Sequence, residues 1–157
     1  MDESLIPFNE AERMALLHQL DILDTDPEEI YDSIAYIASR FCQVPTSTIT
    51  FIDHERQWFK AAIGTKNKEN PRDHSFCAHT ILGDDILEIP DSHNDERFKN
   101  NPLVRGNPYI RFYAGVPLEL NDGLKVGTLC VLDDKPHKLN QEQLKILRFL
   151  AFKLQNF

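Results

Sequence analysis

The segment from Arg72 to Leu82, RDHSFCAHTIL, places an arginine, two histidines and a cysteine within eight residues. Imidazole and thiolate groups are zinc ligands, and a histidine beside a cysteine can also lower the pKa of the thiol and raise its reactivity. An arginine can hold a carboxylate or phosphate through its planar guanidinium group. The segment could therefore be a metal site, a nucleophile with its base, or the lip of a binding pocket.

A zinc site here would use His74, Cys77 and His79, with His93 as a fourth ligand. The spacings of three and two residues do not match the paired Cys-x-x-Cys or His-x-x-x-His signatures of zinc sites. We therefore expect no metal site in this chain.

A nucleophilic site would pair Cys77 with His74 or His79. The other two cysteines, Cys42 and Cys130, fall in a predicted helix and a predicted strand, at positions typical of small core residues. In the strand, Cys130 shares the alternation of Val126 and Leu132. Three cysteines so far apart do not form a disulfide framework, which agrees with a reducing compartment.

Two connections of about twenty residues, 65–85 and 91–110, interrupt the strand pattern. Connections this long in a small domain are usually functional or mobile. Within or next to them lie four arginines: Arg72, Arg97, Arg105 and Arg111. The arginines favour a pocket for a small polar or anionic molecule. The alternative is that they balance Asp91, Asp95 and Glu96 in ion pairs that order the loops.

Three helices are predicted around these connections. The first begins at Asn9, which with Glu12 is typical of a capping box, and the second begins at Asp26. The last opens with a second capping box, between Asn140 and Gln143. Their apolar residues recur at helical spacing: Leu16, Leu20 and Leu23; Ile30, Ile34, Ile37 and Phe41; Leu144, Leu147, Ala151 and Leu154.

Five stretches rich in β-branched and aromatic residues are predicted as strands: 47–53, 57–64, 86–90, 111–120 and 125–133. Asn121, Asp122 and Gly123 indicate a hairpin between the last two. Pro117 indicates an edge or a bulge. Helices at both ends with strands between them predict an α+β fold, with helices on one side of a largely antiparallel sheet.

Alternation within the strand 111–120 separates its residues into two faces. If Phe112 and Ala114 pack against the helices, then Arg111 and Tyr113 face the long connections. These two are the strongest candidates for pocket residues.

Composition excludes several classes of partner. The 157 residues suffice for a single domain, and 17 basic against 25 acidic side chains give a formal charge of −8. Such a surface repels nucleic acid and anionic lipid. The sequence has no stretch able to cross a bilayer and no signal peptide at its start, so we expect a cytoplasmic protein.

Three motifs in order, RDHSFCAHTIL, ILEIPDSHNDERFKNNPLV and IRFYAGVPLELNDGLKVGTLCVLDDKPHKLNQEQLKILRFLA, resemble the GAF domain. The resemblance covers residues 10–154 and is greatest to the subgroup found ahead of diguanylate cyclase or histidine kinase output domains. It implies a central antiparallel sheet of five or six strands. Helices from the two chain ends would pack on one face, and the long connections would cover a pocket on the other.

The resemblance implies a non-catalytic sensory domain that binds a small molecule, regulates an output domain or partner, and dimerises through its terminal helices. The apolar stripes of the first and last helices would suit a parallel two-fold dimer. The ligand and any cofactor stay unidentified. Ligand contacts are expected from eight residues: Phe76, Cys77, His79, Arg72, Asp91, Arg97, Arg111 and Tyr113.

Other GAF activities fit the motifs less well. Free methionine sulfoxide reductases of the family use cysteines, and a reductase centred on Cys77 would need a partner thiol that the predicted positions of Cys42 and Cys130 do not supply. Bilin-binding relatives often have histidine directly after the attachment cysteine, where this chain has Ala78. Cyclic-nucleotide-binding relatives carry the signature Asn-Lys-x-x-Phe-x-x-x-Asp-Glu. The only Asn-Lys pair of this chain, Asn67-Lys68, continues as Glu-Asn-Pro and does not match it. A dimerisation module with an empty pocket is the remaining alternative.

Overall fold

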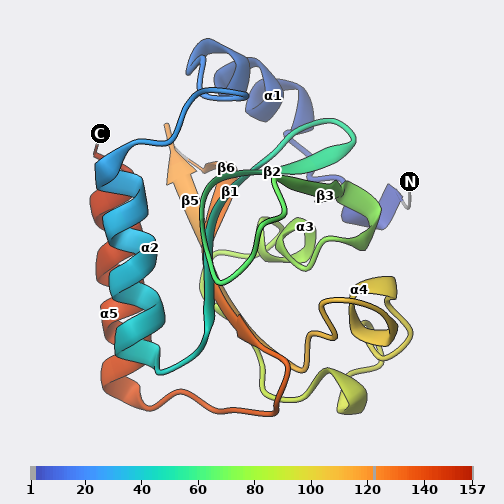
Figure 1. The fold of residues 1–157 in the computed structure, drawn as a ribbon. Coiled ribbons are helices and arrows are strands. Elements are labelled where there is room, and N and C mark those ends of the chain that lie inside the picture. The colour runs from blue at the N-terminus through green and yellow to red at the C-terminus, as the bar shows by residue number, and fades with distance from the viewer. Residues whose placement is uncertain (1–2, 122, 157) are drawn as a thin grey trace.

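The computed structural model describes residues 3–121 and 123–156, and its centre is an antiparallel sheet with the strand order β3-β2-β1-β6-β5-β4 (Figure 1). The strands are β1 (Thr46–Ile52), β2 (Arg56–Ile63), β3 (Glu69–Pro71), β4 (Leu87–Ile89), β5 (Phe112–Leu120) and β6 (Leu124–Asp133). Sequence patterns predicted all but β3, whose sequence Glu-Asn-Pro has no β-branched or aromatic residue. In the β5–β6 hairpin, Asp122 lies outside the described residues.

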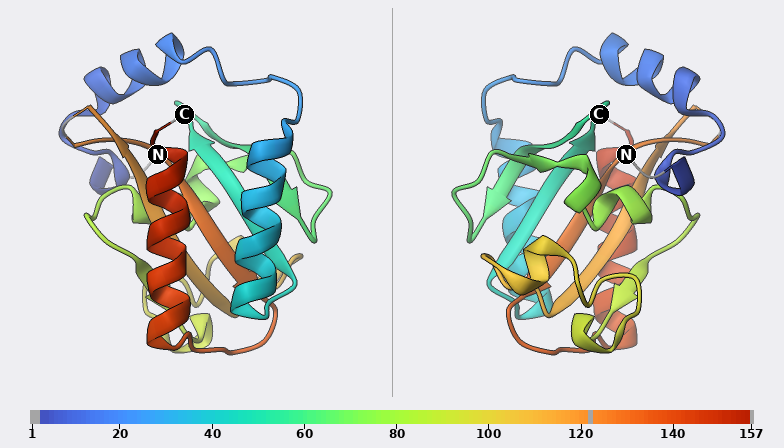
Figure 2. Two further views of the ribbon diagram at one scale, coloured as in Figure 1. Left: turned by 90° about the vertical axis from the view of Figure 1, so that its left-hand side faces the viewer. Right: turned by 90° about the vertical axis from the view of Figure 1, so that its right-hand side faces the viewer.

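The helices are α1 (Glu10–Gln19), α2 (Glu29–Cys42), α3 (Cys77–Thr80), α4 (Pro102–Arg105) and α5 (Gln141–Leu154). Helices α2 and α5 lie side by side on one face of the sheet, and α3 and α4 lie on the other (Figure 2). Among the described residues, no helix is both long enough and apolar enough to cross a membrane. The α+β architecture with a six-stranded antiparallel sheet is therefore confirmed.

The two predicted capping boxes have different outcomes. At α5, the side chain of Asn140 accepts from the Gln143 N–H and the reciprocal bond is also present. At α1 the prediction was wrong, because the Asn9 side chain makes no capping bond and instead donates to the Gly123 carbonyl, 3.3 Å away. A polar residue at the predicted cap can thus be diverted by a nearby strand turn.

Helix α2 begins two residues later than the sequence predicted, with Glu28 instead of Asp26 at the N-cap. The carbonyl of Asp26 accepts a hydrogen bond from the buried Lys60 ammonium at 2.7 Å, and Glu28 has an extended backbone. The β2 strand therefore holds the connection between α1 and α2 out of helical conformation.

The face of the sheet toward α2 and α5 carries the larger apolar core. Phe112, Ala114, Val116 and Leu118 of β5 face this side, as the alternation predicted. They meet Leu147 and its buried neighbours on α5. Each buried Leu or Phe stabilises the fold by about 1.5–3 kcal/mol.

Pro117 lies within β5 but avoids a lost ladder bond. Strand β4 pairs with β5 only from Tyr113 to Gly115. At Pro117, β5 therefore pairs with β6 on one side and has no neighbouring strand on the other. A register shift follows between Leu118 and Glu119. Both the local edge and the bulge expected for Pro117 are present.

A bulge in β6 decides which way its cysteine faces. Leu118 pairs with Gly127 and the next β5 residue pairs with Lys125, so Val126 is the extra residue of the bulge. Alternation is interrupted there. Val126 joins the helix-side core, whereas Cys130 is buried in the cluster on the opposite side. The expectation that Cys130 would pack as Val126 does was therefore wrong.

Helix α1 lies across the end of the sheet (Figure 1). Its Arg13 is fully buried and donates to the Ile52 carbonyl at 2.8 Å and to Glu10 at 2.9 Å. Glu10 also accepts from Arg72 at 2.6 Å. Burial alone would raise the pKa of Glu10, but the hydrogen bonds from Arg72 and Arg13 lower it to about 2. These bonds join α1 to the connection that leads into α3.

Candidate functional site

A cavity of about 270 Å³ lies on the loop side of the sheet. Its polar walls consist mainly of neutral side chains: Thr46, Thr48, Gln57, Thr65, Asn67, Asn70, Asn107 and Tyr113. Its apolar walls are Phe59, Phe76, Leu103, Pro108, Ile110 and Leu132. Lys66 is the one cation among the described lining residues, and none of those residues carries a carboxylate. The lining suits a small polar molecule that is neutral or weakly anionic.

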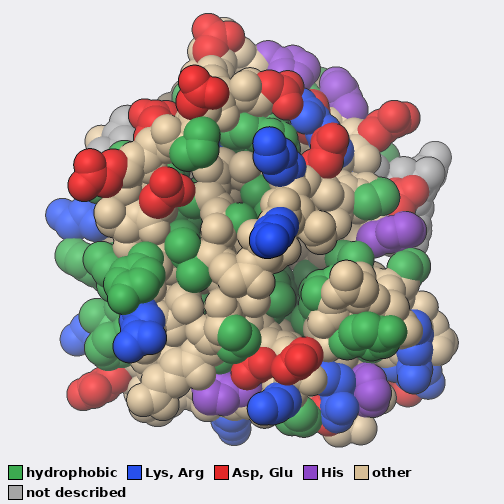
Figure 3. Space-filling view, in the orientation of Figure 1, with side chains coloured by type: hydrophobic (Ala, Val, Ile, Leu, Met, Phe, Trp, Pro, Cys, Tyr) green, Lys and Arg blue, Asp and Glu red, His purple; other side chains and the backbone are tan. Residues whose placement is uncertain are grey.

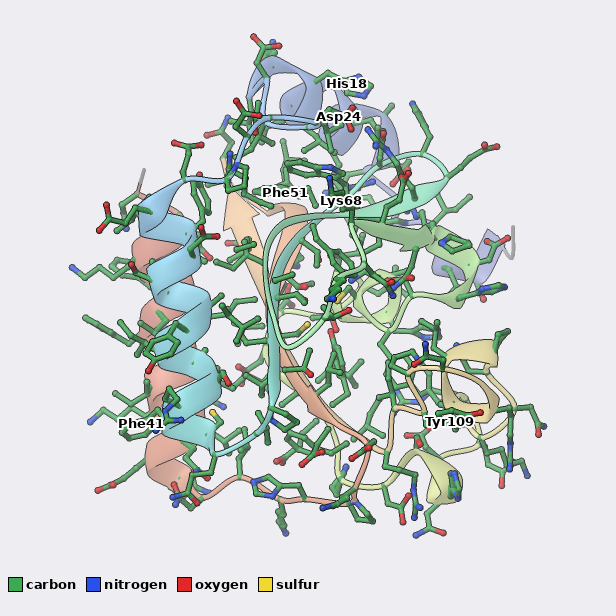
Figure 4. The ribbon with its side chains drawn as sticks, in the orientation of Figure 1. His18, Asp24, Phe41, Phe51, Lys68 and Tyr109 are labelled. Carbon is green, nitrogen blue, oxygen red and sulfur yellow. The ribbon has the colours of Figure 1, made fainter. Side chains whose placement is uncertain are left out.

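The surface around this side of the molecule shows a related charge distribution. In Figure 3 basic side chains stand near the centre of the face, and others lie along its left, lower and lower-right parts together with acidic side chains. In Figure 4 the segment that includes Lys68 crosses the same face in front of the sheet. The nearest of these charges to the cavity is Lys66 in its lining, which would favour an anionic over a cationic ligand.

Cys77, the first residue of α3, forms part of the cavity wall and is surrounded by polar groups. Its Sγ atom lies 3.0 Å from Thr128 Oγ1, 3.1 Å from Tyr113 Oη and 3.2 Å from Gln57 Nε2. The Sγ atom of Cys130 is 3.9 Å away. Helix α3, β2, β5 and β6 together therefore place one sulfur among three groups able to donate hydrogen bonds, with a second sulfur beside it.

The environment acts in opposite directions on the two thiols. Burial raises the pKa of Cys77, but hydrogen bonds from Cys130, Thr128 and Tyr113 outweigh it and lower the pKa to about 7. The interaction with Cys77, together with burial, raises the pKa of Cys130 well above its usual value. Cys77 is thus the thiol that ionises first, and Cys130 keeps its proton.

Tyr113 reaches this cluster because of a glycine two residues along the strand. A Cβ atom at Gly115 would lie only 2.1 Å from the Tyr113 Oη atom. The same oxygen lies 2.7 Å from Thr80 Oγ1 on α3. The missing side chain at Gly115 thus leaves the space in which the phenol lies against β5 and contacts α3.

Comparison with known proteins identifies the family. The profile of the GAF domain matches residues 26–155. The chain belongs to the GAF family. This GAF domain is 44% identical over 130 residues to the protein named cyclic di-GMP phosphodiesterase PA2567 of Pseudomonas aeruginosa, with 83% of this chain and 22% of that protein aligned. The chain thus spans about a fifth of the length of that relative.

Solved structures share the fold at low sequence identity. The GAF domain of an Acinetobacter phosphoenolpyruvate-protein phosphotransferase aligns with a TM-score of 0.64 and 15% identity, over 99% of this chain and 93% of that one. A free methionine-R-sulfoxide reductase from Neisseria meningitidis, solved with its substrate, aligns with a TM-score of 0.64 and 13% identity, over 93% and 86%. Both are similar to this GAF domain in fold.

The structure brings three of the eight expected ligand residues to the cavity: Phe76, Cys77 and Tyr113. The Phe76 ring stacks on Phe98 with centroids 4.2 Å apart. The His79 ring packs edge-on against Phe98 at 4.5 Å, and His79 borders a shallow outer depression beside α3. Of the two histidines near Cys77 in sequence, neither lines the cavity.

The expected arginines and aspartate are engaged in ion pairs outside the cavity lining. Arg111 donates twice to Asp91, at 2.8 and 2.9 Å. Arg97 donates to Asp95 at 3.0 and 2.8 Å. Arg72, which is 1% exposed, donates to Glu10. The ion-pair alternative raised from the sequence therefore describes Arg97 and Arg111, whose partners are Asp95 and Asp91. Arg72 is also in an ion pair, but its partner is Glu10, which that alternative did not include.

Several lining residues were missed by sequence reasoning, among them Thr48, Gln57 and Lys66. A usable signal existed for the first two. Buried strands rarely carry polar side chains without a partner, and both residues lie in predicted strands with apolar neighbours. Lys66 lies in a polar loop and has no such signal. Throughout the described ranges, no three His, Cys, Asp or Glu side chains gather as a metal ion would require.

Proposed function

We propose that this GAF domain is a non-catalytic sensory module whose cavity binds a small polar molecule and so regulates an output domain or partner. The observation that carries the proposal is the cavity itself. Its walls combine aromatic rings with neutral amide and hydroxyl groups. Phe76, Cys77 and Tyr113 would contact the ligand, together with Gln57 and Lys66. The volume lies below the roughly 300–1,000 Å³ of pockets for drug-sized ligands, so the ligand is smaller than a dinucleotide.

The relative in Pseudomonas aeruginosa supports the regulatory part of the proposal. Its name states a cyclic di-GMP phosphodiesterase activity, and the aligned region is 22% of that protein. We propose that this chain likewise controls a signalling output, either a cyclic di-GMP enzyme or a histidine kinase.

The sheet offers a route from the cavity to the helices. In β5, Tyr113 faces the cavity while its neighbours Phe112 and Ala114 belong to the core that contacts α5. A ligand can shift the arrangement of α2 and α5 only if it binds two arrangements with different affinity. A ligand that draws Tyr113 toward the cavity would move the strand on which α5 packs.

Ligand binding is tested by native mass spectrometry and by thermal unfolding with amino acids, nucleosides and small carboxylic acids as probes. A probe at 100 times its Kd should stabilise the domain by about 2.7 kcal/mol. Lys66→Met should weaken binding of an anionic probe, whereas Lys68→Met, outside the cavity lining, should not. A purified protein without adduct mass, and without a stabilising probe, would favour the empty dimerisation module.

We further propose a homodimer across the outer surfaces of α2 and α5. Ile30, Ile37 and Phe41 recur along one side of α2 and are 45, 45 and 41% exposed, and Phe149 and Phe152 on α5 are 52 and 57% exposed. The two helices stand side by side in Figure 2, and Phe41 is labelled near the end of α2 in Figure 4. On α1 the apolar residues Met14 and Leu17 are buried, whereas Leu20, from the predicted stripe, is 40% exposed.

Analytical ultracentrifugation tests the dimer. Ile37→Glu and Phe149→Glu should each produce monomers, because a charge would be buried in the interface. Leu82→Glu is the matched control, since Leu82 is 41% exposed beyond α3 on the other side of the sheet. A monomeric wild-type protein at high concentration would contradict this part of the proposal.

A thiol reductase is the second candidate function, favoured by the second sulfur at 3.9 Å from Cys77. The assay is formation of methionine from free methionine sulfoxide in the presence of a dithiol reductant. Methionine formed by the wild type and not by Cys77→Ser would establish the reductase. Absence of methionine would leave the binding role as the function of the cavity.

A further inference from the structure

The two adjacent sulfurs are the feature that ligand sensing leaves unexplained. Cys77 and Cys130 are 53 residues apart in sequence, yet their Sγ atoms are 3.9 Å apart. Each residue is only 1% exposed, and both form part of the cavity wall. The cavity is therefore the route by which a small reagent would approach the two thiols.

The neighbours of the two sulfurs assign them different roles. Thr128, Tyr113 and Gln57 all lie within 3.2 Å of Cys77 Sγ and can donate to a thiolate there. Cys130 Sγ has Thr48 Oγ1 at 2.9 Å and the Cys77 sulfur on its other side. A thiolate is the nucleophilic form of cysteine. Cys77 is therefore placed to attack first, and Cys130 to attack the oxidised sulfur.

We propose that Cys77 and Cys130 form a reversible redox pair that a small hydroperoxide, entering through the cavity, oxidises to a disulfide. The Cys77 thiolate attacks one peroxide oxygen and the O–O bond breaks, giving a sulfenic acid and a hydroxide or alkoxide that takes up a proton. Cys130 then attacks the Cys77 sulfur. The S–S bond forms, the S–O bond breaks, and the leaving hydroxide takes the Cys130 proton. Two thiols and one hydroperoxide yield one disulfide, one alcohol or water, and one further water.

A disulfide requires the two sulfurs to approach each other. A disulfide bond is about 2.0 Å long, so the sulfurs must close by about 1.9 Å. Cys130 lies in β6, which pairs with β1 and β5 on its two sides. Cys77 lies in a four-residue helix within a long connection. We expect α3 to move toward β6, which draws Cys77 away from Gln57 and changes the cavity wall. This redox chemistry does not depend on whether the cavity also binds an organic ligand.

The third cysteine provides an internal control. Cys42 lies on α2 on the other side of the sheet and is also fully buried. Burial raises its pKa to about 12, and it lines none of the described cavity. It shares the burial of Cys77 but neither its polar neighbours nor its position beside a cavity.

The experiment treats the reduced chain with hydrogen peroxide, then stops the reaction, unfolds the protein and counts its thiols. We expect one remaining thiol, Cys42, an intact mass lower by two hydrogens, and a peptide that links Cys77 to Cys130. Cys42→Ala should react at the wild-type rate. Cys130→Ser should accumulate a sulfenic acid on Cys77 that dimedone traps, and Cys77→Ser should form no disulfide. A dithiol should restore the original mass.

Three results would overturn the proposal: retention of all three thiols, oxidation of Cys42 as fast as Cys77, or a disulfide that links two chains. Circular dichroism shows whether each variant is folded. Because the decisive peptide comes from the wild-type protein, loss of folding in a variant does not affect the outcome. The rate of disulfide formation should rise through about pH 7, whereas an unfolded thiol would follow the ordinary cysteine pKa of about 8.5.

Discussion

Two cysteines that are equally buried on opposite sides of one sheet differ in their chemistry. Cys42 lies among apolar side chains of the α2–α5 core, and burial raises its pKa to about 12. Cys77 lies on the cavity side, where hydrogen bonds from Cys130, Thr128 and Tyr113 lower its pKa to about 7 despite burial. Exposure alone therefore does not indicate the reactivity of a thiol. The groups that replace water around the sulfur decide it.

The two sides of the sheet differ in the same way as the cysteines. The α2–α5 side is filled by apolar side chains such as Leu129 and Leu147. The other side contains a smaller apolar cluster and a cavity with polar walls. One sheet can form both the apolar core and the cavity wall, because consecutive residues of β5 and β6 face opposite sides.

The largest expected contrast is in alkylation of the native protein. Hydrogen-bonding neighbours lower the pKa of Cys77 whereas burial raises that of Cys42, so a much larger fraction of Cys77 is ionised near neutral pH. Iodoacetamide should therefore label Cys77 first, and its rate should rise as pH increases through 7. Peptide mass spectrometry measures both sites in one sample. Equal labelling of the two cysteines would break the comparison.

The second contrast is in packing. Leu147→Ala should destabilise the protein by about 2–5 kcal/mol, because Leu147 is fully buried in the filled core. Leu132→Ala should cost less, since Leu132 borders space that is already empty. Urea unfolding followed by Trp58 fluorescence compares the two. If Leu132→Ala costs as much, the cavity side is packed as tightly as the helix side.

The third prediction concerns Glu10, which joins α1 to the connection on the cavity side. Glu10→Gln should reduce stability at pH 7 by about 1–2 kcal/mol. The substitution removes the negative charge that pairs with Arg13 and Arg72, and the effect is moderate because the Glu10 carboxylate is partly exposed. The folded pKa of about 2 lies below the unfolded value, so this contribution is present above about pH 5 and is lost as pH falls toward 2. The variant and wild type should therefore converge in acid. Glu12→Gln, at an exposed position of the same helix, should behave as wild type.

The smallest effect is expected from Tyr113→Phe. The change removes the hydroxyl near Cys77 and Thr80 but keeps the ring. With one neighbour fewer to stabilise the thiolate, the pKa of Cys77 should rise, and alkylation at pH 7 should slow by less than about tenfold. The pH profile of Cys77 labelling measures the shift. An unchanged profile would show that Thr128 and Gln57 suffice.

Sequence patterns predicted the larger elements because each has a long enough periodic signal. Residues 111–120 alternate over their whole length, so the direction of Tyr113 followed from parity. Strand β3 consists of Glu, Asn and Pro, and none of these residue types indicates a strand. For Cys130, alternation predicted the wrong side of the sheet because a bulge at Val126 interrupts it. The bulge arises from how β6 pairs with β5, and the sequence of β6 alone does not reveal that pairing.

Residue type alone also could not separate a ligand contact from a structural contact. Arg72 and Arg111 have the chemistry to bind an anion, but Glu10 and Asp91 are their partners in this fold. The partners come from positions 62 and 20 residues away. Such pairs are visible only after the chain has folded, whereas local turns such as the Asn140 cap depend on neighbours in sequence.

The space above Gly115 has a consequence for how related sequences can diverge. Because a Cβ there would lie 2.1 Å from the phenol oxygen of Tyr113, the two positions cannot vary independently. A chain that keeps tyrosine at the first position should keep glycine at the second, and a larger residue at the second should accompany a shorter side chain at the first. Among related sequences, this pair should therefore covary, and each substitution made alone should be tolerated less well than the two together.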